Sequence, residues 1–340
     1  NFSLLSVRFD QHPCFELTAN GSNLLESSLN KKKSRKPVLF VDNIKTSSFE
    51  SVQLGDICNK NALEQAVNAF LSSLKSDEYG LRELHEYTQI LPGRFYEPGS
   101  HLENRKVAFG LKNSDERLFL SWVLLRSKAS DFDYSTIPDL KKQWDYFSLR
   151  KDGITKKSIM YFAKQYCPNE YEKVKKNTIA YYIDETIKSG NAELAGTDFD
   201  LALVLYQMFK DKYVCSSIVQ KKFYTFINHR WVLDQGYSLR LSISSDMYAM
   251  YQDKILEYMH EMQKYSEEDI ARNNLQIKIR SMAKLCQKMK MSQHKNNIMR
   301  EAMELFYDKD FIRKQDSNKY LMCFNNCVVD FKNKEVRAGY

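Results

Sequence analysis

TDFDLALVLYQMFKDKYVCSSIVQKKFYTFINHRWVL, residues 197–233, contains the change of periodicity that decides the fold. The first part predicts a helix that Thr197 or Asp198 caps, with one apolar face. That face consists of Leu201, Val204, Leu205 and Phe209. From Tyr213 onward, short runs of β-branched and aromatic residues alternate with turn residues, which is typical of two or three antiparallel strands. We therefore expect a small sheet after a buried helix.

Helical periodicity also precedes this stretch. Residues 61–90 carry apolar residues on one face, and Pro92 and Gly93 then end the helical run. Residues 102–175 read as a compact helical unit that contains Trp122 and Trp144, with Thr155 capping one of its helices.

After the strands the sequence predicts further helices and a final hairpin. One helix should start after Ser245 and run to about Lys264. Residues 266–269 resemble a capping box, and helix should then continue to about Tyr307. The end of the chain predicts a hairpin with its turn at Asn325-Asn326.

These patterns give a mainly α (α+β) fold: helical domains with a small antiparallel β-meander and a C-terminal β-hairpin. We expect three regions. Residues 1–60 form an irregular, strand-containing linker, which includes a short strand at 38–41 and a basic run at 31–36. Residues 61–176 form a helical domain, and residues 177–340 form a second domain with a β-hairpin at 213–233 and another at 320–337.

Composition narrows the class of protein. The 340 residues are 43% hydrophobic, which is enough for buried cores, while only 11 Gly and 6 Pro favour long helices. The first residue is Asn1, which suggests a processed or excised chain. Because no run of about 18 apolar residues occurs, we expect a soluble intracellular protein without membrane contact. Seven scattered cysteines without a C-x-x-C pair predict free thiols, with no disulfide and no metal site.

The net charge of +8 has a single source. The 29 residues from Arg272 to Arg300 hold eight Lys or Arg and no Asp or Glu, and the rest of the chain is balanced. Like charges repeated on one helical face repel, and contact with phosphates would offset that cost. A solvated or subunit-facing surface is the alternative. The candidate nucleic-acid-binding residues are Lys278, Arg280, Lys284, Lys288, Lys290, Lys295 and Arg300.

The sequence offers little for catalysis, and we assign no catalytic residue. There is no Walker A motif, and residues 153–158 lack its second glycine. Asp131 and Asp133 have the spacing of a two-metal carboxylate pair, but their surroundings favour a turn that leads into a helix. The six histidines are dispersed, and His229-Arg230-Trp231 reads as part of a strand.

Three segments together resemble the primase–helicases of nucleocytoplasmic large DNA viruses, the poxvirus, asfarvirus and mimivirus type. The first includes Leu91-Pro92, the run 105–111, Trp122, Trp144 and the run 155–164, and it is similar to the helical module after the primase core. The second is the strand region that ends in His229-Arg230-Trp231. The third, residues 321–331 with Arg337, resembles the family's Phe-x-Asn-Gly-Val-x-Asp-Leu hairpin, although Cys327 stands in place of the glycine.

The resemblance covers roughly residues 90–340, and it implies a segment between an archaeo-eukaryotic primase and a superfamily-three helicase. It implies that residues 61–176 are primase-C-terminal-like and that residues 177–340 form a collar-like domain before the helicase. For the parent protein it implies DNA as a partner, a hexameric ring, ATP and Mg²⁺, and a cytoplasmic viral replication site. The segment itself needs no cofactor.

Three hypotheses follow from these observations. The first is a non-catalytic connector and collar that supports ring assembly and DNA engagement. The second is a stand-alone helical nucleic-acid-binding module without ring assembly. The third is a metal-dependent enzyme that uses Asp131 and Asp133.

Overall fold

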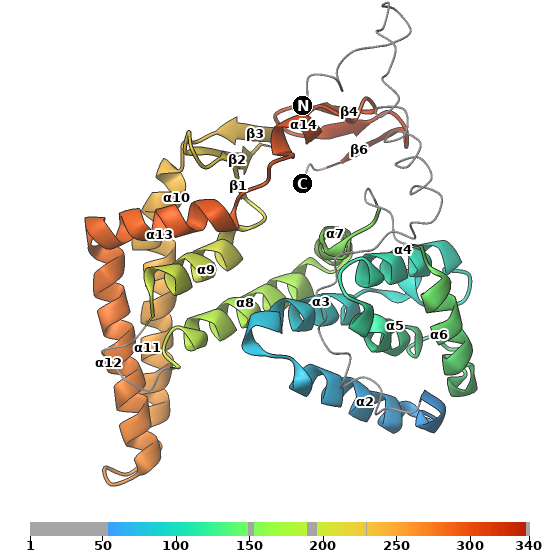
Figure 1. Cartoon of the computed structure of the whole chain (residues 1–340), viewed down its shortest axis with the longest axis horizontal. Coiled ribbons are helices and arrows are strands. Elements are labelled where there is room, and N and C mark those ends of the chain that lie inside the picture. The colour runs from blue at the N-terminus through green and yellow to red at the C-terminus, as the bar shows by residue number, and fades with distance from the viewer. Residues whose placement is uncertain (1–53, 149–152, 189–195, 229, 338–340) are drawn as a thin grey trace, which may run out of the picture. The chain divides into compact units, whose positions relative to one another are not determined.

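The computed structural model describes residues 54–148, 153–188, 196–228 and 230–337 (Figure 1). They form helices and two small antiparallel sheets, so the predicted mainly α class is confirmed. The C-terminal element is a sheet of three strands, where the sequence suggests a two-stranded hairpin. The strand and the basic run expected before residue 54 lie outside the described residues.

The first helices form one module. These helices are α2 (Lys60–Ser73), α3 (Tyr79–Gln89), α4 (His101–Lys112), α5 (Phe119–Arg126), α6 (Ile137–Tyr146), α7 (Lys156–Tyr166) and α8 (Pro168–Glu185). The centre of the module is α5, which is buried on nearly all sides and packs against α2, α3, α4 and α6. Short 3₁₀ turns connect several of them: η2 (Leu54–Asp56), η3 (Ser76–Glu78), η4 (Gly93–Phe95), η5 (Glu116–Leu118) and η6 (Tyr134–Thr136). Thr155 is the N-cap residue of α7, as the sequence predicts.

Two tryptophans form the centre of this helical module. The rings of Trp122 and Trp144 stack with centroids 5.7 Å apart, and Phe119 meets Trp144 edge-on at the same separation. The indole N–H of Trp122 donates to Asn104 Oδ1 over 3.0 Å, and Asn104 Nδ2 donates to the carbonyl of Phe95. Buried aromatic rings contribute large apolar area, and the two hydrogen bonds fix their orientation.

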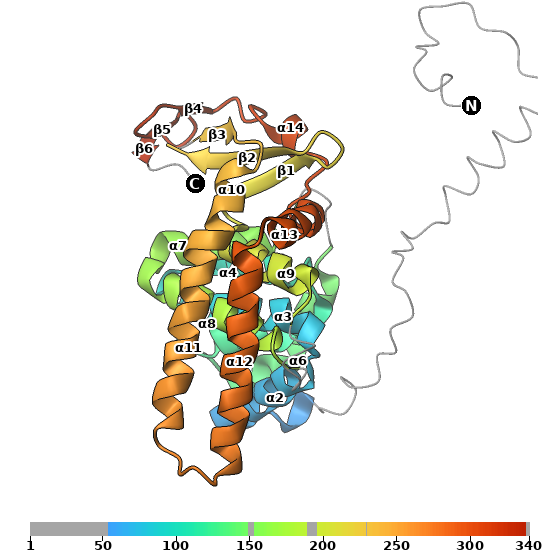
Figure 2. The ribbon, with the colours of Figure 1, turned by 90° about the vertical axis from the view of Figure 1, so that its left-hand side faces the viewer.

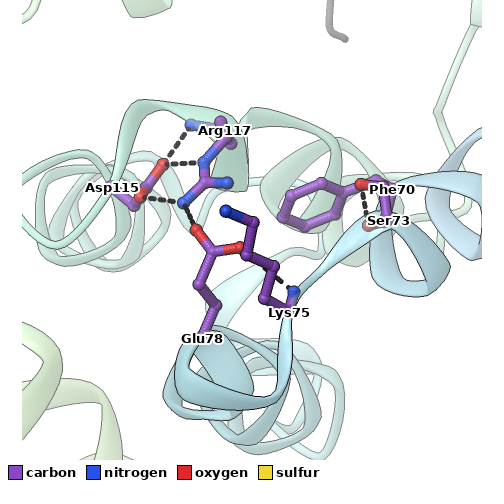
Figure 3. Close-up of polar contacts among 6 residues, drawn as sticks. All are labelled: Phe70, Ser73, Lys75, Glu78, Asp115 and Arg117. Atoms are coloured by element: carbon purple, nitrogen blue, oxygen red, sulfur yellow. Dashed lines mark hydrogen bonds and ion pairs between the residues drawn. The ribbon is translucent and has the colours of Figure 1, made fainter. Parts of the chain in front are cut away.

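An ion-pair cluster joins the turn between α2 and α3 to the start of α5 (Figure 3). Arg117 Nη2 lies 2.6 Å from Glu78 Oε1 and 2.9 Å from Asp115 Oδ2. Hydrogen bonding to Arg117 is the main cause that lowers the pKa of Glu78. The other Glu78 oxygen accepts the backbone N–H of Lys75, so one carboxylate holds both the turn and the arginine.

The second part begins with α9 (Asp198–Phe209), and Thr197 caps it by accepting the N–H of Asp200. The strands β1 (Tyr213–Ser217), β2 (Lys222–Ile227) and β3 (Arg230–Leu233) follow in an antiparallel meander, as the change of periodicity predicts. Residues 306–308 cover the free edge of β1, since Cys215 N donates to Phe306 O and Asp308 N donates to Cys215 O.

The helix predicted to start after Ser245 starts earlier. α10 (Tyr237–Ser242) continues through a π-helical turn, Ile243–Met247, into α11 (Tyr248–Met262). Leu239, Ile243, Met247 and Tyr251 are all fully buried and recur every four residues. That spacing would drift around an α-helix of 3.6 residues per turn, and the wider π turn keeps the row on the core face.

The predicted helix to Tyr307 is divided in two. α12 (Ile270–Lys290) lies antiparallel beside α11 (Figure 2), and Met291 is extended, with ψ at 129°. α13 (Ser292–Leu305) then crosses to pack on α9. Asp269 is the N-cap residue of α12, so the capping-box residues 266–269 form the turn before the helix.

Sulfur is abundant in the core under α12. Buried side chains there include Met208, Cys215, Met247, Met282, Cys286, Met289 and Met303. Among the described residues before α9, by contrast, no methionine is fully buried. The flexible thioether fills irregular space between helices that meet at different angles.

The chain ends with α14 (Phe311–Lys314) and a second sheet of β4 (Leu321–Cys323), β5 (Val328–Asp330) and β6 (Glu335–Arg337). The predicted turn at Asn325-Asn326 joins β4 to β5, with Phe324 N donating to Cys327 O. No residue from 324 to 327 has a positive φ, so the turn does not need the family's glycine.

The domain boundary expected at 176/177 falls inside α8, so the two predicted domains share this helix. Leu54–Tyr340 cluster as one compact unit. The division into a primase-C-terminal-like and a collar-like domain stays a prediction.

Candidate nucleic-acid interface

α12 is amphipathic. Leu275, Met282, Cys286 and Met289 are buried, and Ile279 is partly buried against the same core. The basic residues therefore occupy the remaining faces of the helix. Arg280 and Lys284, four residues apart, are exposed, and within the part of the chain that the structure describes neither forms an ion pair.

Three other predicted lysines on α12 have intramolecular partners. Lys288 Nζ donates to Gly196 O over 2.8 Å, and Lys290 Nζ donates to Ser244 O over 2.7 Å. Lys290 also lies 3.9 Å from the ring centroid of Tyr248, and Lys278 lies 5.3 Å from that of Tyr258. These contacts hold α12 against its neighbours, so part of the basic excess has a structural role.

The last two predicted residues, Lys295 and Arg300, lie on α13, beyond the break at Met291. The seven residues are thus distributed over two helices with different directions (Figure 1). Lys295 is partly exposed and Arg300 is exposed. Arg300 faces a groove that the sequence does not reveal.

This groove has a volume of about 710 Å³ and lies between the β1–β2 turn, the start of α10 and one face of α13. Every charged residue that lines it is basic: Lys221, Lys222, Arg240 and Arg300. Amide side chains complete the polar lining: Gln220, Gln235, Asn296 and Asn297. Tyr237 is 73% exposed at the same site. Cations, amides and an exposed ring in one groove are the groups that bind phosphates and bases.

The groove is partly preorganised. Arg240 donates through Nε and Nη2 to Asn296 Oδ1, at 3.1 and 3.0 Å, which joins α10 to α13. Gly236 forms part of the lining with φ at +78°, and a Cβ there would lie 2.9 Å from a ring carbon of Phe223. Only glycine fits this backbone conformation so close to a neighbouring ring.

Nearby carboxylates already have partners. Asp198 accepts from His294 Nδ1 and from Asn297 Nδ2, both at 2.9 Å. Asp234 accepts the backbone N–H of Ser238 over 3.3 Å. Among the residues that the structure describes, none of the four cations of the groove forms an ion pair, so each keeps its charge for a ligand.

Sequence reasoning missed Lys221, Lys222 and Arg240 because they are not part of a charge run. Gln235 and Gly236 both have positive φ, at 55° and 78°, and together they reverse the chain between β3 and α10. The Gln-Gly pair after a strand was the one available signal of this tight turn.

The other candidate residues have ordinary structural contacts. Asp133 accepts the N–H and the hydroxyl of Ser135 at the start of η6, and these bonds lower the pKa of its carboxyl. This is the turn role that the sequence favours for Asp131 and Asp133. Within the described ranges, no group of three or more His, Cys, Asp or Glu could hold a metal ion.

Trp231 and the His85–Ser121 pair also have packing roles. Trp231 meets Phe226 and Phe311, each with centroids 5.2 Å apart, while His229 lies outside the described residues. His85 Nδ1 and Ser121 Oγ lie 2.9 Å apart, but both side chains are buried. A nucleophile needs access to substrate, so this pair is structural.

Comparison with known proteins gives a consistent set of relatives. A family model described as "D5 N terminal like" matches residues 202–340. The "Putative helicase L207/L206" of Acanthamoeba polyphaga mimivirus is 28% identical over 232 residues, 67% of this chain and 23% of the relative. The "Putative primase C962R" of African swine fever virus (isolate Tick/Malawi/Lil 20-1/1983) is 22% identical over 77% of this chain and 28% of the relative.

A third relative, the "Putative helicase 022R" of Frog virus 3, is 23% identical over 56% of this chain and 22% of its own length. The chain thus spans less than a third of each relative. Among the described residues, no helix combines the length and apolar character needed to cross a membrane.

Proposed function

Since the chain belongs to the primase–helicase family of large DNA viruses, we propose that it is the non-catalytic connector and collar region of such a protein. In this role it engages DNA through phosphate contacts and supports assembly of a ring during viral DNA replication. The parent protein would supply primase and NTP-dependent helicase activity, with ATP and Mg²⁺ bound elsewhere.

The groove beside α13 carries the DNA part of the proposal. Four cations from three separate segments converge there, and no carboxylate lines it. Its 710 Å³ falls within the range of roughly 300–1,000 Å³ of small-molecule sites, so a nucleotide unit fits. A base can stack on the exposed ring of Tyr237 while its phosphates meet Arg240 and Arg300.

Arg280 and Lys284 on the outer face of α12 provide a second, weaker contact region. Both side chains are exposed, so their attraction to phosphate is screened by salt. Contacts of this kind carry no sequence information, so the binding is independent of DNA sequence.

Ring assembly is supported by apolar surface on the α11–α12 pair. Leu256 and Met259 are exposed three residues apart on α11, and Ile270 at the start of α12 is 81% exposed. Exposed apolar side chains on one helical pair are a common feature of subunit contacts.

Binding of a fluorescent single-stranded oligonucleotide at about 50 and about 200 mM salt tests the DNA contact. Charge reversal in the groove, with Lys222→Glu and Arg300→Glu together, should weaken binding by roughly tenfold or more and reduce its salt dependence. Lys284→Glu should have a smaller effect. Lys60→Glu on α2 is the matched control, because Lys60 is exposed in the first helical module.

Light scattering on the same samples tests assembly. Leu256→Glu with Ile270→Glu should reduce the mass of the oligomer and leave DNA binding by the monomer intact. A chain that binds DNA but stays monomeric at every concentration would support the stand-alone module instead. Groove variants that bind DNA as tightly as the wild type would contradict the DNA part of the proposal.

A further inference from the structure

A second cationic cavity lies in the first helical module, apart from the groove. It has a volume of about 220 Å³ between α4, α5 and α6. Its lining includes His101, Asn104, Arg105, Trp122, Arg126 and Gln143, and no lining residue is acidic. The proposed function does not use it.

The two arginines of this cavity lack the carboxylate partners that Arg117 of the same module has. Arg117 is shared by the carboxylates of Glu78 and Asp115 (Figure 3). In the residues that the structure describes, neither Arg105 nor Arg126 takes part in an ion pair. Two guanidinium groups at one cavity without a carboxylate repel each other, and an anion between them would remove that cost.

Arg126 is held in place for such a contact. One of its terminal nitrogens, Nη1, donates to the carbonyl of Tyr96 over 2.6 Å, which leaves its remaining N–H groups for another acceptor. Arg105 is exposed on α4, so it can move to meet a ligand. A fixed and a mobile guanidinium together suit the several oxygens of a phosphate group.

The wall beside the arginines is rigid and largely apolar. Trp122 is 2% exposed, and Asn104 fixes it by accepting its indole N–H. Leu140 of α6 lines the same cavity. Cationic groups next to an apolar wall favour a ligand that has both a negative charge and an apolar face, which a sugar phosphate has and an inorganic ion lacks.

We propose that this cavity binds the phosphate end of a nucleotide, with Arg105 and Arg126 on the phosphate and the sugar against Leu140, over the buried Trp122. The volume of about 220 Å³ is smaller than that of a site for a whole drug-sized ligand. The phosphate and part of the sugar fit inside, and the base extends past His101 and Gln143. Two sources offer this chemistry: a free nucleotide and the 5′ end of a DNA strand.

Calorimetric titration of the whole chain with dATP, and with inorganic phosphate for comparison, tests the site. Arg105→Gln should weaken dATP binding by about tenfold, since it removes a charge-assisted hydrogen bond. Arg126→Lys keeps the charge but loses the planar fork, and should also bind more weakly. These titrations use the Lys222→Glu/Arg300→Glu background, so that the groove does not contribute. Arg313→Gln on α14 is the matched control, because this exposed arginine lines neither the cavity nor the groove, and it should leave dATP binding unchanged.

The two sources are separated with oligonucleotides that carry a 5′ phosphate or a 5′ hydroxyl, in a Lys222→Glu/Arg300→Glu background. If the oligonucleotide with a 5′ phosphate binds more tightly than the one with a 5′ hydroxyl, and Arg105→Gln abolishes this difference, the site binds strand ends. If Arg105→Gln weakens only the binding of dATP, the site binds free nucleotides. If Arg105→Gln alters neither affinity while its thermal unfolding matches the wild type, the proposal is wrong. That result is independent of DNA binding in the groove.

Discussion

Lys210, the C-cap residue of α9, contacts both carboxylate oxygens of Glu83 on α3, at 2.7 and 2.8 Å, across 127 residues of sequence. Gln207 accepts a third hydrogen bond from the same ammonium group. Burial lowers the pKa of Lys210, and the charge of Glu83 opposes that shift. The pair joins the first helical module to the helix that starts the second.

Removing one partner of this pair should therefore destabilise the whole unit. Glu83→Gln leaves the buried ammonium without its counter-charge, and we expect the free energy of unfolding to fall by about 3 kcal/mol in urea denaturation at neutral pH. Lys60→Gln, which breaks the exposed pair with Glu64, should cost less than about 0.5 kcal/mol. Equal stability of the two variants would show that the buried pair does not connect the modules.

His85 should make stability depend on pH in the acid range. Burial lowers its pKa from 6.5 to about 4. Above pH 6.5 the imidazole is neutral in both states, and below it the unfolded chain takes up the proton first. Stability should thus fall on the order of 3 kcal/mol between pH 6.5 and about 4, and change little from this group below that.

His85→Asn isolates this contribution. The difference in unfolding free energy between wild type and variant, measured at several pH values, should be largest near neutral pH and shrink toward pH 4. A difference that stays constant over this range would mean that the folded protein accepts the proton on His85 without penalty.

Gly236 should be intolerant of a side chain. Its φ of +78° and the 2.9 Å approach of Phe223 predict that Gly236→Ala destabilises the fold by about 2 kcal/mol, seen as a lower thermal midpoint. Gly80→Ala is the matched control. Gly80 lies in α3 with open space around it, so alanine there should stabilise by about 0.5–1 kcal/mol.

Thiol reactivity should follow the burial of the cysteines. Cys58 and Cys323 are exposed, whereas Cys215 and Cys286 are buried, with burial raising the pKa of both thiols. Exposed thiols should react with a disulfide reagent first, and the two buried thiols only after denaturant is added. Mass spectrometry of the labelled peptides identifies the order. Rapid labelling of Cys286 would contradict the packing of α12.

The sequence alone indicates the elements whose signals are local. Thr155 and Thr197 cap their helices, and the change of periodicity at Tyr213 marks the sheet, because caps and strand patterns depend on adjacent residues. The break at Met291 escapes prediction because no Gly or Pro produces it. The start of the long helix at Tyr237 is not evident from the sequence, because the π-helical turn at 243–247 changes the spacing of the buried residues along the helix.

The candidate sites are harder to predict because they depend on contacts between distant residues. The run of basic residues identifies α12 as a candidate. It does not show that Lys288 donates a hydrogen bond to Gly196 O, or that Arg300 lines a groove together with Lys222. Arg105 and Arg126 are unremarkable in the sequence. Only the three-dimensional arrangement brings them to one cavity without a carboxylate.

The sulfur-rich core under α12 has a chemical consequence. Oxidation turns a methionine side chain into a polar sulfoxide, which a packed apolar core cannot solvate. Met282 and Met289 are fully buried in that core, whereas the first helical module is centred on tryptophan. Because both sulfurs are fully buried, peroxide reaches them only when the core opens, so their oxidation in the folded chain should be slow and should then prevent α12 from packing back onto the core.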